Sequence, residues 1–135
     1  MDKKHTIMVV EDEHLLLEAI TKKLTLTGIE VIPCASGTEA IAYLDSHSEV
    51  PDAIWLDYYL KDMNGLDFLR LLKKNTKAAN TPVLVVSNSA SESNVHNMLA
   101  LGASQYILKS EYRLDEIITM LLDLVSKKNE KDSHR

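Results

Sequence analysis

The sequence predicts an α/β domain: a doubly wound (βα)5 three-layer sandwich with a parallel sheet in the order 2-1-3-4-5. Two observations support this fold class. Five short apolar or β-branched runs recur along the chain, and five longer amphipathic stretches alternate with them. Strands that are apolar throughout and separated by helices indicate a parallel sheet covered on both faces, with right-handed crossovers.

The expected strands are short runs that read as buried on both faces of a sheet. In chain order they are 6–10 (TIMVV), 30–34 (EVIPC), 53–57 (AIWLD), 82–86 (PVLVV) and 105–109 (QYILK). Trp55 lies within the third run, and we expect it to anchor the core.

The expected helices repeat apolar residues every three or four positions, as Leu17, Ile20 and Leu24 do in the first. In chain order they cover 13–27, 37–46, 65–75, 92–101 and 113–127. Gly28 and Gly102 follow the first and fourth stretches, where glycine is suited to end a helix.

Size and composition indicate one domain over residues 1–127, followed by a polar tail or linker start over 128–135. The net charge of −5 argues against direct binding of nucleic acid or of an anionic membrane. The lone Cys34 allows no internal disulfide, and we interpret it as a small buried hydrophobe in a reducing compartment. The apolar run near the N-terminus is too short for a signal peptide or a membrane span, so we expect a cytoplasmic protein.

Three acidic side chains fall at the carboxyl ends of neighbouring expected strands. Glu11 and Asp12 directly follow the first strand, and Asp57 ends the third. In an open parallel sheet, ligands bind beyond these strand ends, where the strand order reverses. Clustered carboxylates must be protonated, hydrated or bound to a cation, and oxygen ligands from so few acids suit Mg²⁺.

Two more polar residues stand at strand ends on the same edge of the sheet. Ser87 follows the fourth run, and Lys109 ends the fifth. A carboxylate nucleophile, a metal-binding acid pair, a hydroxyl donor and a lysine together describe a site that accepts a phosphoryl group. In such a site Asp57 attacks, while Lys109, Ser87 and Mg²⁺ stabilise the phosphoryl oxygens.

Four segments carry a resemblance to a known family: MVVEDE, IWLDYYLKDMNGLDFLRLL, PVLVVSNSA and LGASQYILKS. Their order and spacing resemble the receiver (CheY-like) domains of bacterial two-component response regulators, over about residues 5 to 127. The resemblance implies a flavodoxin-like fold. It also implies that Asp57 takes a phosphoryl group from a phosphohistidine of a sensor histidine kinase or a histidine phosphotransfer protein.

By the same resemblance, Asp12, Asp57 and the backbone carbonyl of Tyr59 bind Mg²⁺ directly, and Glu11 acts through water. Ser87 and Tyr106 form a switch pair that shifts the face built from the fourth helix, fifth strand and fifth helix. That face is the expected surface for a downstream protein or an output domain, and a phosphorylation-linked dimer stays open.

Two positions depart from the family pattern. Ser110 follows Lys109 where the family usually has proline, often after a cis bond, and we expect a trans bond here. Lys61 also replaces a common proline, which predicts a more mobile turn before Gly65. The Tyr59 side chain, two positions after Asp57, is a candidate for tuning the lifetime of the acyl phosphate by hindering water.

Two alternatives belong to other functional classes. A receiver fold used only for docking, without phosphorylation, stays open. A haloacid-dehalogenase-type phosphatase, which also uses an aspartyl nucleophile, needs a second acid two residues later, where this chain has Tyr59. We therefore expect no enzyme, but a protein that accepts phosphate on its own Asp57 and assists its own phosphorylation and dephosphorylation.

Overall fold

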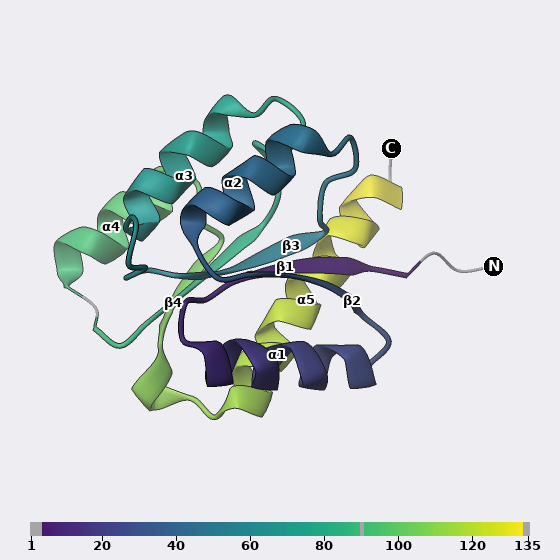
Figure 1. Ribbon diagram of the computed structural model, residues 1–135, viewed down its shortest axis with the longest axis horizontal. Coiled ribbons are helices and arrows are strands. Elements are labelled where there is room, and N and C mark those ends of the chain that lie inside the picture. The colour runs from purple at the N-terminus through teal and green to yellow at the C-terminus, as the bar shows by residue number, and fades with distance from the viewer. Residues whose placement is uncertain (1–3, 90, 134–135) are drawn as a thin grey trace.

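Five parallel strands form one sheet between two layers of helices in the computed structural model, which describes residues 4–89 and 91–133 (Figure 1). The sheet order is β2-β1-β3-β4-β5, so the predicted fold class and strand order are confirmed. The strands are β1 (Thr6–Val10), β2 (Glu30–Cys34), β3 (Ala53–Asp57), β4 (Val83–Ser87) and β5 (Gln105–Leu108).

The helices divide between the two faces of the sheet, with α2, α3 and α4 on one face and α1 and α5 on the other (Figure 1). Their bounds are α1 (His14–Leu26), α2 (Gly37–Ser46), α3 (Gly65–Lys74), α4 (Glu92–Ala100) and α5 (Leu114–Ser133). None of the helices in the described part of the chain is both long and apolar enough to cross a membrane.

Alternating residues of the central strands feed two separate cores, because successive side chains of a strand point to opposite faces. Met8 packs in the core under α2 and α3, while Val9 packs in the core under α1 and α5. Trp55 belongs to the second core and is only 1% exposed, which confirms it as a core residue. The strand ends thereby stay fixed between two packed layers.

Glycines end two of the helices as predicted. Gly28 has φ +86° after α1, and Gly102 has φ +106° after α4, a left-handed conformation that favours glycine. At the start of α3, the Asn64 side chain accepts a hydrogen bond from the Asp67 amide, and the Asp67 carboxylate accepts one from the Asn64 amide. This capping box fixes where the loop after β3 ends.

Several predicted boundaries are wrong by one residue: β4, for example, covers Val83–Ser87 instead of 82–86. β5 ends at Leu108, and Lys109 begins a short 3₁₀ turn, Lys109–Glu111. α5 continues to Ser133 instead of ending at 127, because the polar segment after Ser126 contains no glycine or proline and its lysines and glutamate favour a helix. Residues 134 and 135 of the expected tail lie outside the described residues, and the domain boundary at 127 stays a prediction.

The loop after β5 runs through a trans peptide bond. No peptide bond in residues 4–89 and 91–133 is cis, so the Lys109–Ser110 bond is trans, as predicted.

Candidate functional site

Three carboxylates meet at the carboxyl edge of the sheet. One oxygen each of Glu11, Asp12 and Asp57 lies within 4.8 Å of the other two. They come together because β1 and β3 are hydrogen-bonded neighbours, with Val10 paired to Leu56 just before the acids. Glu11 is 1% exposed and Asp57 7% exposed, so these two carboxylates have little access to water, whereas Asp12 is partly exposed. The structure thus brings together the acids that the sequence placed at two strand ends.

Lys109 reaches into this acidic cluster from the start of the turn after β5. Its Nζ lies 3.0 Å from Glu11 Oε1 and 3.7 Å from Asp57 Oδ1. The ammonium donates a hydrogen bond to Glu11, a residue 98 positions away in the chain. Lys109 is therefore the positive charge that faces both buried carboxylates.

The surroundings of Asp57 raise its pKa to about 7. Burial is the largest cause, the nearby charge of Glu11 adds to it, and Lys109 opposes it. A single lysine does not balance three carboxylates, so the ionised cluster keeps excess negative charge. Its donor atoms are all carboxylate oxygens, the ligands that a hard divalent cation such as Mg²⁺ prefers. The residues present fit a magnesium site.

Ser87 and Tyr106 both contact the segment that follows β4. Ser87 is fully buried at the end of β4, and its Oγ accepts a hydrogen bond from the Ser89 amide at 3.2 Å. The Tyr106 hydroxyl donates to the Ser89 carbonyl at 2.9 Å. The two predicted switch residues are therefore connected through one residue between them.

The Tyr59 side chain extends from the loop after β3 toward α4. It is 52% exposed, its hydroxyl accepts a hydrogen bond from Asn94 Nδ2 at 3.3 Å, and its ring meets that of Tyr58 edge-on at 4.7 Å. Tyr58 in turn lies 6.0 Å from the Tyr106 ring, measured between centroids. Tyr59 thus joins the loop, through aromatic contacts, to the side of the site that carries Tyr106.

Two loop residues contact the site or its neighbours in ways that sequence reasoning missed. The Lys61 amide donates a hydrogen bond to Asp12 Oδ2 at 2.8 Å, and the Asp62 carboxylate accepts three hydrogen bonds from the first residues of α2. In the sequence, Lys61 is notable only because it stands where the family commonly has proline. Asp62 could have been recognised as a residue that binds a helix N-terminus only from being a carboxylate in a loop.

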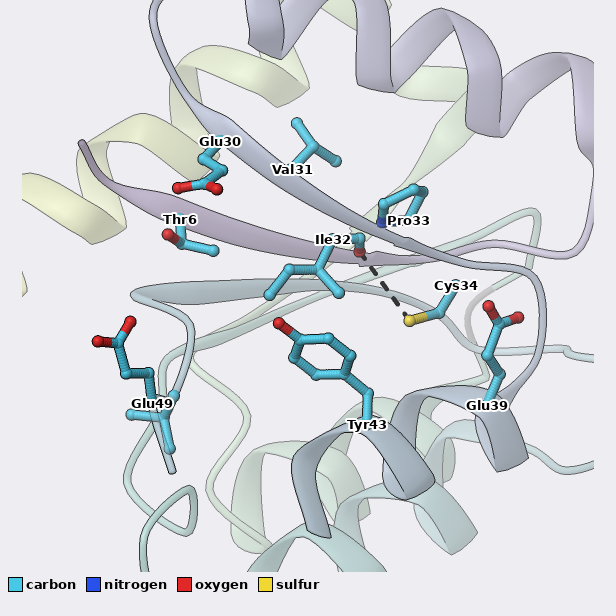
Figure 2. A pocket seen from close by; sticks show the side chains of 10 residues that line it. Thr6, Glu30, Val31, Ile32, Pro33, Cys34, Glu39, Tyr43 and Glu49 are labelled. Carbon is cyan, nitrogen blue, oxygen red and sulfur yellow. Dashed lines mark hydrogen bonds between the residues drawn. The ribbon is translucent and has the colours of Figure 1, made fainter. Parts of the chain in front are cut away.

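A separate pocket of about 370 Å³ lies between β2 and α2, and no residue of the acidic cluster lines it (Figure 2). Cys34 lines it and is buried, and burial together with Glu39 raises the pKa of its thiol to about 12. The thiol therefore stays protonated near neutral pH and is a poor nucleophile. This agrees with the interpretation of Cys34 as a small buried hydrophobe.

Comparison with known proteins places these features in a family. The family model for the response regulator receiver domain matches residues 7–122. The two-component response regulator ORR8 of Oryza sativa subsp. indica is 33% identical over 103 residues, which cover 76% of this chain and 84% of ORR8. The transcriptional regulatory protein KdpE of Mycobacterium tuberculosis (strain CDC 1551 / Oshkosh) is 33% identical over 115 residues, 85% of this chain but only 48% of KdpE.

A solved structure shows the same fold. The receiver domain of the sensor histidine kinase PA1611 from Pseudomonas aeruginosa, with a magnesium ion coordinated in its active-site cleft, matches with a TM-score of 0.78 and 22% identity. The match covers 92% of this chain and 99% of that domain.

Sheet order and the acidic cluster at the switch point define a receiver-type signalling domain of two-component systems, a class distinct from classical enzymes. Because the family model matches most of this chain, residues 7–122, the chain belongs to the response regulator receiver domain family.

Proposed function

We propose that this domain is the phosphorylatable switch of a two-component phosphorelay, with Asp57 as the phosphoacceptor. The phosphoryl group comes from a phosphohistidine on a sensor histidine kinase or a histidine phosphotransfer protein. One observation supports the proposal most directly: the buried Asp57 carboxylate lies 3.7 Å from Lys109 Nζ, inside an oxygen cluster with Glu11 and Asp12.

In the transfer, the protein supplies the nucleophile and the groups that stabilise the phosphoryl oxygens. An Asp57 oxygen attacks the phosphorus atom, a P–O bond forms, and the P–N bond breaks with its electron pair left on the imidazole nitrogen. Lys109 stabilises negative charge on the phosphoryl oxygens, and the Ser87 hydroxyl donates to one of them. Ser87 ends β4, the strand next to β3, and Lys109 directly follows β5, with its Nζ 3.7 Å from Asp57 Oδ1.

Asp12, Asp57 and the main-chain carbonyl of Tyr59 would hold Mg²⁺, and Glu11 would act on it through water. Bound Mg²⁺ stabilises the charge of the transferring phosphoryl group. The all-oxygen donor set and the magnesium ion in the PA1611 receiver domain support this assignment.

Phosphorylation changes the surface through Ser87 and Tyr106. As Ser87 turns its hydroxyl toward the phosphoryl group, the Tyr106 ring moves inward and gives up its bond to the Ser89 carbonyl. The population then shifts on the face built from α4, β5 and α5, which binds a downstream protein, an output domain or a second copy of the domain. KdpE, which is about twice as long as the matched region, is a transcriptional regulator and supports an output role.

Incubation with acetyl phosphate and Mg²⁺, followed by intact-mass measurement, tests the phosphoacceptor. We expect one added phosphoryl group on the wild-type chain, and none on Asp57→Asn or in a sample treated with EDTA. Trp55 is the only tryptophan and shares a cavity of about 120 Å³ with Lys109, so its fluorescence should also report beryllofluoride binding.

A docking module that works without phosphorylation predicts the opposite pattern. In that case the wild-type mass stays unchanged, and beryllofluoride leaves the Trp55 fluorescence as it was. An unchanged mass alone would contradict phosphorylation by acetyl phosphate, and unchanged fluorescence alone would contradict beryllofluoride binding beside Trp55. Both results together would replace the proposed switch with the docking function.

Tyr59 sets the lifetime of the phosphorylated state by shielding the acyl phosphate from water. Tyr59→Ala removes the ring held by Asn94 and Tyr58, so we expect several-fold faster phosphate loss after excess acetyl phosphate is removed. Tyr43→Ala is the matched control, because the Tyr43 ring stacks on His47 at the far end of α2. An unchanged lifetime in Tyr59→Ala would end this idea.

A further inference from the structure

The loop after β3, residues 58–64, is closed by its own main-chain hydrogen bonds. The Gly65 amide donates to the Tyr58 carbonyl at 2.7 Å, and the Leu60 amide donates to the Met63 carbonyl at 3.1 Å. An isolated antiparallel bridge also joins Tyr59 to Asn64. The loop is therefore a compact unit. A contact that fixes its tip also helps to fix the position of Tyr59 at its base.

The tip of the loop is bound to the start of α2 through Asp62. Asp62 Oδ1 accepts from the Gly37 amide at 3.1 Å, and Oδ2 accepts from the Thr38 amide at 2.8 Å and the Thr38 hydroxyl at 2.6 Å. The two amides are donors that a helix leaves unused at its N-terminus, where a carboxylate is favourable, and the Thr38 hydroxyl adds a side-chain donor. Burial alone would raise the pKa of Asp62, but the bonds from Thr38 and Gly37 outweigh it and lower the pKa.

The neighbouring residue binds the acidic cluster. The Lys61 amide donates to Asp12 Oδ2 at 2.8 Å, across 49 positions of sequence. Proline, which is common at this place in the family that the sequence resembles, has no amide hydrogen and cannot make this bond. Lys61 therefore gives Asp12 a contact that depends on the residue type at position 61, through its main chain and not its side chain.

We propose that the Lys61 amide and the Asp62 carboxylate are positioning groups for the magnesium site. Asp62 fixes the loop tip on α2, and the fixed loop presents the Lys61 amide to Asp12. The same contact holds the loop that carries the Tyr59 carbonyl. Hydrogen bonds to a metal ligand orient that ligand, and losing one commonly weakens metal binding by about tenfold or more. This inference rests on the proposed function, because it assigns Mg²⁺ to the acidic cluster.

Lys61→Pro and Lys61→Ala separate the main-chain contact from the side chain. Lys61→Pro removes the amide hydrogen, whereas Lys61→Ala keeps it and removes only the ammonium group. We expect an Mg²⁺ dissociation constant about tenfold higher for Lys61→Pro, and within about twofold of wild type for Lys61→Ala. The measurement is an Mg²⁺ titration followed by amide NMR shifts, with Mg²⁺ alone as the probe.

We call the Lys61 and Asp62 contacts together the clamp. Asp62→Ala tests its second contact, which attaches the loop tip to α2. We expect it to weaken Mg²⁺ binding and to raise the hydrogen-exchange rate of the Lys61 amide in metal-free protein by about tenfold. Asp62→Asn, which keeps one acceptor oxygen for Thr38, should fall between Asp62→Ala and wild type. Asp123→Ala is the control, because Asp123 is exposed on α5, on the opposite face of the sheet.

The outcomes separate this inference from the proposed function. If Lys61→Pro binds Mg²⁺ as tightly as Lys61→Ala, and the Lys61 amide exchanges equally fast in Asp62→Ala and wild type, the clamp is wrong although the metal site stands. If the wild-type chain takes up neither Mg²⁺ nor a phosphoryl group, the proposed function fails and the clamp with it. A lower melting temperature with unchanged Mg²⁺ affinity would mean a purely structural role and would also overturn the clamp.

Discussion

Lys109→Met is expected to slow phosphoryl uptake from acetyl phosphate by about 100-fold. Lys109 is the positive charge that faces both Glu11 and Asp57, at 3.0 and 3.7 Å. Removing one preorganised donor from the position where charge develops commonly costs 10² to 10³ in rate. Methionine keeps an unbranched apolar chain beside Trp55 in their shared cavity, so the substitution removes the charge with little loss of packing.

The rate is measured by intact mass against time at saturating Mg²⁺. Lys127→Met serves as the control, because Lys127 is exposed on α5, and it should react at the wild-type rate. Equal rates for Lys109→Met and wild type would mean that Lys109 only balances the charge of Glu11. The proposed role for Lys109 in the transfer would then be wrong.

The fold and the approach of the acids could be predicted from local sequence patterns. Short apolar runs between amphipathic stretches specify a parallel sheet, and the strand order places the ends of β1 and β3 side by side. Glu11 and Asp57 then meet because Glu11 directly follows β1 and Asp57 is the last residue of β3, so no loop geometry has to be known. Residues fixed to strand ends are predictable in this way because the sheet itself sets their positions.

Contacts made through loops and main-chain atoms could not be predicted in the same way. The bond from the Lys61 amide to Asp12 depends on how a seven-residue loop folds back, and its donor is a main-chain amide that no side chain marks in the sequence. The direction of Tyr59 toward Asn94 likewise depends on the path of that loop and on where α4 begins. The continuation of α5 to Ser133 could not be predicted because a polar, charged composition fits both an exposed helix and an unstructured tail.

Asp57→Asn is expected to stabilise the metal-free protein at pH 8 by about 2 to 4 kcal/mol. The folded-state pKa of Asp57 is about 7, raised mainly by burial and then by Glu11, whereas an unfolded aspartate titrates near 3.9. Between these two values the folded state binds more protons than the unfolded state. The wild-type free energy of unfolding should therefore fall as pH rises from about 4 to about 7.

Asparagine carries no charge at any of these pH values, so the fall caused by Asp57 should be missing from the variant. Denaturant unfolding in EDTA at pH 4 and pH 8 measures the difference: near zero at pH 4, largest at pH 8. Asp123→Asn, at an exposed site, should follow the wild-type curve at both pH values.

Mg²⁺ should then stabilise the wild type more than Asp57→Asn, because ligand binding stabilises only a folded state that can hold the ligand. A variant that gains nothing at pH 8 would show that the three carboxylates are already balanced without a cation, and would remove the electrostatic reason for a metal at this edge of the sheet.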